Sequence, residues 1–327
     1  MRLAVLITQH HRLLSLAAIL DVFDAVNRFY AEEDKPSFFE IELIGNDPDM
    51  VSRELQQKFN FTLLKTVNSL PEVVLVPAFS AVDPKVAIED NTAFAPLLMQ
   101  CLHRETPIAS FCTGAFLLAG FGLLDQKKAT THIDAKIGFS TAFPKVKLLP
   151  HAVFTKDGEL YTSGGATNSF QLKLLLIEKY CGRAMAIKVA KMFAIDMDRE
   201  SQLYFENFNP VPVEQDKLVN RLQLRMKQEY NKINNLEEMM DDLPSSRRNL
   251  IRRFKQSVGM TPIKYLQYIK IEAAKRALEE TDLSIMEVML TSGYTDMKNF
   301  RNLFKKITGL TPKAYRDKFA MQREVYV

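Results

Sequence analysis

Cys112 is the residue of this 327-residue chain whose surroundings most clearly suggest chemistry. The apolar stretch PIASF runs directly into it, and the small residues Ser110 and Gly114 lie two positions before and after it. A helix-forming run follows, so the order is strand, nucleophile, helix, which is typical of a nucleophile elbow. A thiol at such a helix N-terminus meets a dipole and free backbone N–H groups that favour the thiolate. His132 is the candidate partner.

Three interpretations of Cys112 stay open. It could be a catalytic nucleophile, a buried and inert thiol in a structural turn, or part of a ligand pocket. The third follows because ligands of open α/β sheets bind outside the carboxyl ends of the strands. In that case Cys112 and His132 line an effector pocket together with His10 and His11.

A second group of chemically competent residues is basic and lies towards the C-terminus. Residues 217–327 carry 22 Lys and Arg against 13 Asp and Glu, whereas residues 1–216 carry 21 against 26. An acidic half joined to a basic half predicts that only the basic half contacts nucleic acid.

A repeat positions the basic residues. The first copy comprises Asn249, Phe254, Lys255, Gly259, Thr261, Pro262 and Tyr265, and the second comprises Asn299, Phe304, Lys305, Gly309, Thr311, Pro312 and Tyr315. Each copy predicts a short basic helix that ends at a glycine, followed by Thr-Pro opening the next helix. Two copies are too few for a solenoid. They favour a pair of helices held about one DNA turn apart, roughly 34–36 Å, for successive major grooves.

The first recognition helix is predicted at Arg247–Val258 with Ser246 as its cap, and the second follows the cap Asp296. A long helix, Ile263–Glu280, joins them. Candidates for base edges, where the fork of arginine matches guanine, are Arg247, Arg248, Arg252, Arg301 and Asn302. Lys298 also remains on the outer face, and the phosphate contacts are assigned to Arg253, Lys255, Lys305 and Lys306.

Apolar strand-like runs alternate with helical stretches through the first 200 residues. Strands are expected at Leu3–Thr8, Phe39–Ile44, Val73–Pro77 and Pro107–Phe111, with a hairpin at Ala152–Thr162. Helices are expected at Leu13–Phe29, Ala93–Arg104, Thr113–Leu124, Thr167–Tyr180 and Ala184–Met197. This alternation predicts an α/β domain whose largely parallel sheet has helices on both faces, followed by an all-α domain.

Domain bounds and cellular context follow from composition. We expect an α/β domain over 1–206, a proline-containing linker over 207–216 and an all-α domain over 217–327. Three cysteines without close spacing, no signal peptide and no apolar run of membrane length predict a cytoplasmic protein without a membrane partner. No metal-ligand spacing and no phosphate-cradling loop is present, so neither a metal nor another cofactor is expected.

Two stretches resemble known families. SGYTDMKNFRNLFKKITGLTPKAYR, within the last hundred residues, resembles the double helix-turn-helix domain of the AraC/XylS family of bacterial transcriptional regulators. SFCTGAFLLAGFGLLDQKKATTH resembles the PfpI-type branch of the class I glutamine amidotransferase-like superfamily, which is often fused to AraC-type domains. The second resemblance implies a flavodoxin-like fold over roughly residues 1–200 and carries that family's cysteine and histidine onto Cys112 and His132.

The resemblance also shows a departure from the enzymes. They place an acidic residue early in the first helix, and the matching position here is Ser15, which joins the candidate pocket. A nucleophile without an orienting acid is a poor catalyst. The resemblance therefore implies a non-enzymatic, sequence-specific regulator that senses a small-molecule effector and forms a homodimer. Its partners would be promoter DNA and, for an activator, RNA polymerase. The alternative is a cysteine-dependent amidase or hydrolase, using Cys112 and His132, with an appended DNA-binding module.

Overall fold

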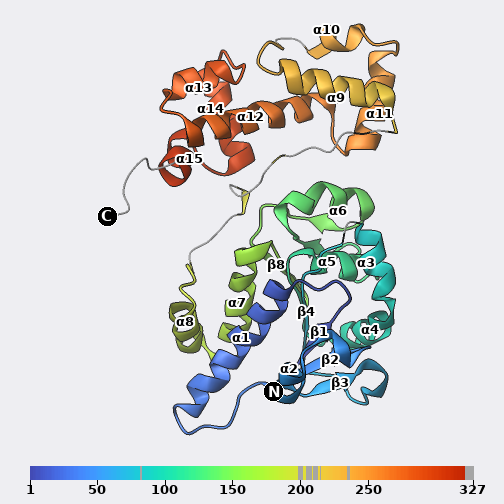
Figure 1. The fold of residues 1–327 in the computed structure, drawn as a ribbon, viewed down its shortest axis with the longest axis vertical. Coiled ribbons are helices and arrows are strands. Elements are labelled where there is room, and N and C mark those ends of the chain that lie inside the picture. Colours follow the sequence, from blue (N-terminus) through green and yellow to red (C-terminus); the bar gives the residue numbers. More distant parts are fainter. Residues whose placement is uncertain are drawn as a thin grey trace. The chain divides into compact units, whose positions relative to one another are not determined.

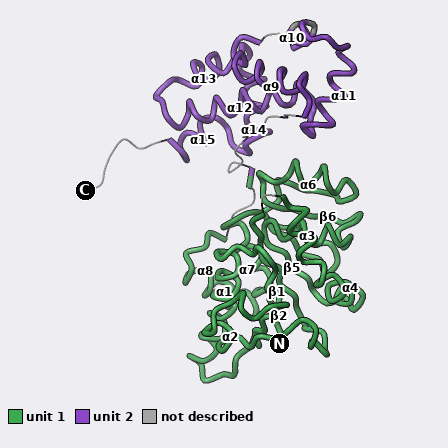
Figure 2. Tube along the Cα trace, turned by 45° about the vertical axis from the view of Figure 1, so that its right-hand side comes forward, with its two compact units in different colours: residues 1–202 green, residues 203–327 purple. Residues whose placement is uncertain are grey.

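The chain forms two compact units, Met1–Gln202 and Leu203–Val327, shown in different colours in Figure 2. The computed structural model describes residues 1–81, 83–197, 202–203, 208, 213, 215–233 and 236–320. Most of the predicted linker lies outside the described residues. No helix among the described residues has the length and apolar character needed to span a bilayer.

The first unit is built around a seven-stranded sheet (Figure 1). Its strands, in spatial order, are β3 (Phe61–Leu63), β2 (Glu40–Gly45), β1 (Arg2–Ile7), β4 (Val73–Val76), β5 (Ile108–Ser110), β9 (Leu160–Ser163) and β8 (Phe154–Asp157). All neighbouring pairs are parallel except the β8–β9 hairpin. Strands β6 (Lys128–Ala129) and β7 (Lys147–Leu148) form a separate parallel pair. The predicted largely parallel sheet is confirmed.

Helices cover both faces of this sheet because its central strands are apolar on both sides. In β1, Leu3, Val5 and Ile7 join one core, and Ala4 and Leu6 join the other. The first core is completed by α1 (Leu13–Ala31), α2 (Arg53–Phe59), α7 (Ser169–Cys181) and α8 (Arg183–Met192). The second is completed by α3 (Pro84–Asp90), α4 (Ala95–His103), α5 (Ala115–Gly120) and α6 (Lys136–Ala142).

Short 3-10 helices connect several of these elements. They are η1 (Pro48–Met50), η2 (Leu64–Thr66), η3 (Thr92–Phe94), η4 (Cys112–Gly114), η5 (Ile133–Ala135) and η6 (Ala166–Asn168). The helix predicted at Thr113–Leu124 is therefore two elements, η4 and α5, and it ends where Gly122 adopts a φ of +77°. The turn at Cys112 and Gly114 packs closely against the end of β4. A Cβ on Gly114 would lie 2.7 Å from the carbonyl oxygen of Pro77 and 2.9 Å from that of Val76.

The second unit is helical in its described part. Its elements are α9 (Lys217–Glu229), α10 (Leu236–Asp241), α11 (Arg247–Val258), α12 (Pro262–Glu280), α13 (Ile285–Thr291), α14 (Met297–Thr308) and α15 (Pro312–Phe319). The two predicted recognition helices, α11 and α14, are both twelve residues long and are offset by fifty positions. Side chains of Ser246 and Asp296 cap their N-termini. Left-handed glycines end them, with φ of 79° at Gly259 and 78° at Gly309.

The same packing recurs in both copies. Phe254 of α11 packs edge-on against Tyr265, with ring centroids 5.2 Å apart. Fifty residues later Phe304 of α14 packs in the same way against Tyr315, at 5.5 Å. Since these rings are buried, each recognition helix presents its apolar face to the interior and its charged face to solvent.

Lys270 of α12 connects the segment before α10 with the segment after α13. Its Nζ donates hydrogen bonds to the carbonyl oxygens of Ile233 (3.0 Å), before α10, and Gly293 (2.8 Å), after α13. Gly293 has a φ of +79°, and a Cβ there would lie 2.8 Å from Cα of Asn231. The backbone at Asn231 therefore lies close to the backbone at Gly293, and the ammonium of Lys270 bonds to both segments.

We predict that Gly114→Ala lowers the thermal midpoint of the first unit, because the new methyl group meets fixed backbone oxygens on β4 and the adjoining loop. Overpacking of this kind costs about 1–3 kcal/mol. The matched control is Gly138→Ala on α6, where a Cβ meets nothing within 4 Å. Thermal unfolding followed by circular dichroism compares them, and equal midpoints would contradict the close approach of the elbow to β4.

Candidate ligand pocket and nucleic-acid interface

A cavity of about 360 Å³ lies at the carboxyl ends of β4 and β5, beside the first turn of α1. Of the predicted pocket residues, it brings together Cys112, His132 and Ser15. His10 and His11 are not among its lining residues. His10 Nε2 lies 2.7 Å from the Asp90 carboxylate, and His11 Nδ1 lies 2.8 Å from the carbonyl oxygen of Thr8. These contacts hold both rings away from the cavity.

The backbone at Cys112 has the conformation expected of an elbow, with a φ of 56° in a non-glycine residue. Such a φ is uncommon and marks local strain. The side chain is only 7% exposed. Burial raises the pKa of the thiol, although the backbone of Ala166 and Thr113 and the charge of Arg12 act in the opposite direction. The expectation of a favoured thiolate is therefore wrong, because desolvation outweighs the helix terminus.

His132 and Ser15 are bonded to the backbone instead of to the thiol. His132 Nδ1 accepts a hydrogen bond from the backbone N–H of Asp134 (3.2 Å), and burial lowers the pKa of the ring. Ser15 Oγ accepts from the backbone N–H of Ala78 (2.9 Å). In the described part of the chain, no hydrogen bond joins the Cys112 thiol to the His132 ring. The three side chains share a cavity without forming a nucleophile–base pair.

Lys173 is a feature of this region that the sequence reasoning missed. It lies on α7 and is fully buried. Its Nζ donates to Ser169 Oγ (2.9 Å) and lies 4.5 and 4.6 Å from the ring centroids of Phe111 and Phe170. Burial lowers its pKa to about 7. The available signal was its place within an apolar run, QLKLLLI, where a lysine has to be buried or break the pattern.

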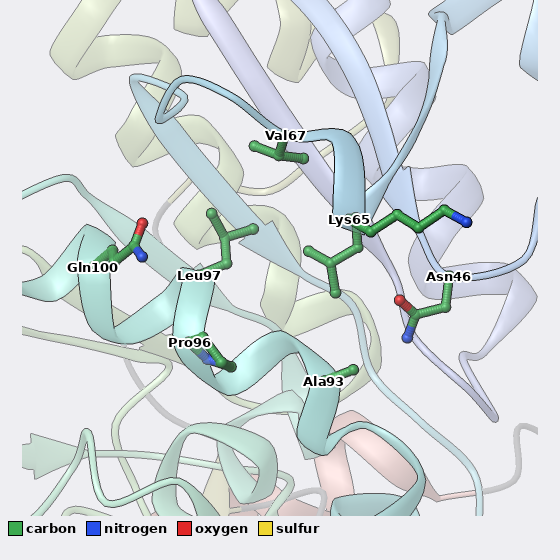
Figure 3. Close-up of a pocket in the computed structure, with 8 residues that line it drawn as sticks. Asn46, Lys65, Val67, Ala93, Pro96, Leu97 and Gln100 are labelled. Carbon is green, nitrogen blue, oxygen red and sulfur yellow. The ribbon is translucent and has the colours of Figure 1, made fainter.

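A second cavity, also of about 360 Å³, lies beyond β2 and β3 (Figure 3). Its lining comes from the loop after β2, from η2 and from α4. Asn46 and Lys65 lie at one end of the cavity, and Gln100 lies at the other. Since its polar groups are spread over its length, they do not converge on one reacting atom, and the chemically richer cavity is the one at Cys112.

The predicted nucleic-acid contacts lie on the solvent faces of α11 and α14. Those that are exposed are Arg247, Arg248, Arg252 and Lys255 on α11, and Lys298, Arg301, Asn302, Lys305 and Lys306 on α14. The opposite faces carry the buried residues Leu250 and Phe254, and Phe300 and Phe304. Arg252 is oriented by its own helix, since its guanidinium donates to Asn249 Oδ1 (2.9 Å) and Gln256 Oε1 (3.3 Å).

Arg253 has a different environment from the other basic residues. Its guanidinium forms a bidentate pair with Asp216, with distances of 2.8 Å from Nε and 2.6 Å from Nη2. Asp216 also caps α9 by accepting from the backbone N–H groups of Leu218 and Val219. The pair therefore anchors α11 to the start of α9. The second copy has Leu303 at the matching position.

Residues predicted as linker pack onto the second unit. The Phe208 ring lies 4.9 Å from that of Tyr268 and 5.3 Å from that of Tyr265. The backbone N–H of Val213 donates to Gln223 Oε1 (2.9 Å). Together with the Asp216–Arg253 pair, these contacts make the described residues of the segment part of the helical unit.

Comparisons with known proteins match each unit to a different family. A helix-turn-helix domain model matches residues 240–318, and the DJ-1/PfpI family model matches residues 83–179. The HTH-type transcriptional regulator GbdR of Pseudomonas aeruginosa is 26% identical over 214 residues, which cover 64% of this chain and 57% of GbdR. The regulator CdhR of the same species is 27% identical over 234 residues, covering 70% of this chain and 69% of CdhR.

A shorter and stronger similarity is confined to one region. The xylose operon regulatory protein of Escherichia coli is 39% identical over 82 residues, or 25% of this chain and 21% of that protein. For GbdR, the chain spans little more than half the length of the relative. Both family models thus agree with the resemblances seen in the sequence.

We predict that Lys173→Met stabilises the first unit at neutral pH. The pKa of Lys173 falls from 10.5 to about 7 on folding. The resulting penalty is fully present below pH 7 and disappears as the pH rises towards 10.5. At about 1.4 kcal/mol per pKa unit, it is on the order of a few kcal/mol, partly offset by the lost ring contacts.

Thermal unfolding at pH 7 and at pH 9.5 measures this effect. The gain from Lys173→Met should shrink at the higher pH, and the exposed-lysine control Lys191→Met should show no such trend. A gain that did not depend on pH would contradict the assigned cause.

Proposed function

Because the chain carries a DJ-1/PfpI-type domain followed by an AraC-type helix-turn-helix domain, we propose that it is a sequence-specific DNA-binding transcriptional regulator. One observation carries the proposal. Two helices of equal length, equally capped and equally packed, expose basic and polar side chains on their non-core faces. A basic helix that is merely solvated would not require a matched second copy. Binding to two successive major grooves of one duplex requires two such helices.

In this proposal α11 and α14 enter neighbouring major grooves. Arg247, Arg248 and Arg252 of α11, and Arg301 and Asn302 of α14, reach base edges, where bidentate donors discriminate bases. Lys255, Lys298, Lys305 and Lys306 contact phosphates and set the register. Arg253 approaches a phosphate only in competition with Asp216, so we assign it a positioning role first.

The first unit acts as the sensor of the regulator. A small molecule bound beside Cys112 shifts the population of states that differ in DNA affinity, or in contact with RNA polymerase if the protein activates transcription. The regulator works as a homodimer in the cytoplasm. Support comes from the domain order, the pocket and the regulator relatives GbdR and CdhR.

The first test is DNA selection from a random pool, followed by binding measurements on the selected site. We expect Arg301→Ala to weaken binding to that site by about 1–3 kcal/mol and to relax the preference at one base position. Lys305→Ala should weaken binding to all sequences and reduce the slope of affinity against salt by about one. The control Lys227→Ala, an exposed lysine on α9, should leave both unchanged. Equal affinity for unrelated sequences would refute specific recognition.

The positive φ of Cys112 favours a second candidate function, a cysteine-dependent hydrolase. The surroundings oppose it, because the thiol has a raised pKa, the His132 ring is bonded to the backbone, and Ser15 carries no charge. A triad needs a base oriented on the nucleophile.

Cys112→Ala separates the two functions. A regulator with this substitution should keep its affinity for the selected site within about twofold, since Cys112 belongs to the other unit. A hydrolase should lose all turnover of amide and ester substrates. Turnover by the unmodified protein that disappears in the variant would establish the enzyme.

A further inference from the structure

The pocket beside Cys112 has a cation, Arg12, among its lining residues. Arg12 precedes α1, lines the cavity and is exposed. In the described part of the chain its guanidinium forms no hydrogen bond or ion pair. An arginine held at a cavity without a carboxylate keeps its planar fork available for an anion.

A second cation approaches the same cavity from behind its wall. Ser169 and Phe170 line the cavity, and both contact the buried ammonium of Lys173. Lys173 donates a hydrogen bond to Ser169 Oγ at 2.9 Å. The ammonium group therefore lies directly behind a hydroxyl-bearing residue that lines the cavity. Lys173 can donate three hydrogen bonds, yet it forms this one and lies between two rings. A buried cation with so few partners is costly unless something compensates it.

Besides Arg12 and Ser169, the lining combines the polar residues Ser15, Ser80 and His132 with an apolar surface that includes Leu13, Leu14 and Phe170. No aspartate or glutamate is among the described residues that line the cavity. Leu13 and Leu14, at its mouth, are 79% and 68% exposed, which is unusual for two consecutive leucines. A small apolar surface next to a cation matches an amphipathic anion of modest size, since cavities from about 300 Å³ hold small ligands.

We propose that the pocket beside Cys112 binds a small monocarboxylate with an apolar tail. The carboxylate pairs with the Arg12 guanidinium and faces the Ser169 hydroxyl, and the tail lies on Leu13, Leu14 and Phe170. The proposal names the chemical class of the effector and rests on the proposed function only for the ligand's role as a signal. Cationic and zwitterionic ligands fit worse, because the lining has no carboxylate for an ammonium group and Lys173 already lies against the Phe170 ring.

The energetics of Lys173 agree with this assignment. Burial lowers its pKa to about 7, because desolvation disfavours the charged ammonium. A carboxylate nearby favours the charged form. Part of the cost of burying this lysine is then recovered when the ligand binds.

The test is calorimetric titration of the full chain with hexanoate, hexylamine and hexanol. Hexanoate should bind saturably, hexylamine should not bind, and hexanol should bind at least tenfold more weakly than hexanoate. Arg12→Gln should weaken hexanoate binding at least tenfold, and Arg12→Lys should restore part of it. The matched control is Arg28→Gln, an exposed arginine on the same helix, which should bind hexanoate like the unmodified protein.

Two results would overturn the proposal. One is equal binding of hexanol and hexanoate, and the other is hexanoate binding that Arg12→Gln leaves unchanged while circular dichroism shows a folded variant. Binding to the selected DNA is measured on the same samples. If the unmodified chain binds the selected DNA specifically but does not bind hexanoate, only the ligand assignment fails. If it binds hexanoate but shows no specific DNA binding, only the proposed function fails.

Discussion

The helical unit depends on one ammonium group that bonds to a main-chain carbonyl from each of its halves. Lys270 is 8% exposed, burial lowers its pKa, and its Nζ donates to the carbonyl oxygens of Ile233 and Gly293. Hydrogen bonds to a charged donor are stronger than neutral ones. The groove spacing of a duplex is fixed, and two reading helices can match it only if their own separation is also fixed. Lys270 links the segment before α10 to the segment after α13 within the helical unit.

The α/β unit has the backbone conformation of a nucleophile elbow, but among its described residues no hydrogen bond pairs the Cys112 thiol with a base. The backbone at Cys112 has the positive φ of an elbow, yet burial raises the pKa of the thiol, and the His132 ring accepts its hydrogen bond from the backbone of Asp134. Strain of this kind persists only where surrounding structure imposes it, here through Gly114 against β4. What remains is a formed cavity with positive charge around it.

Local signals in the sequence predicted local structure well. The bounds of α11 were predicted because its cap, its apolar spacing and its terminal glycine all lie within one short stretch. The parallel sheet followed from the alternation of strands and helices. The pairing of β5 with β9, some fifty residues apart, gives no such local sign.

The site was predicted less completely, for the same reason. Cys112, His132 and Ser15 were placed in one cavity through an elbow motif and a family resemblance. Lys173 was missed because nothing beside it in the chain reveals the two rings that surround it. Arg253 looked like its basic neighbours, since its partner Asp216 lies 37 residues earlier. Charges whose partners are distant in sequence are the ones that sequence reasoning misassigns.

The Asp216–Arg253 pair makes the two copies unequal in how they are anchored. The first reading helix is fastened in part by opposite charges that are 15% and 33% exposed, whereas the second has the apolar Leu303 at the same place. Mobile ions weaken partly exposed charge pairs and leave apolar packing almost untouched. Rising ionic strength therefore weakens the ion pair that anchors α11 to the start of α9, whereas α14 has no such pair at the matching position. At this one position, therefore, the first copy is anchored by an ion pair and the second carries an apolar side chain.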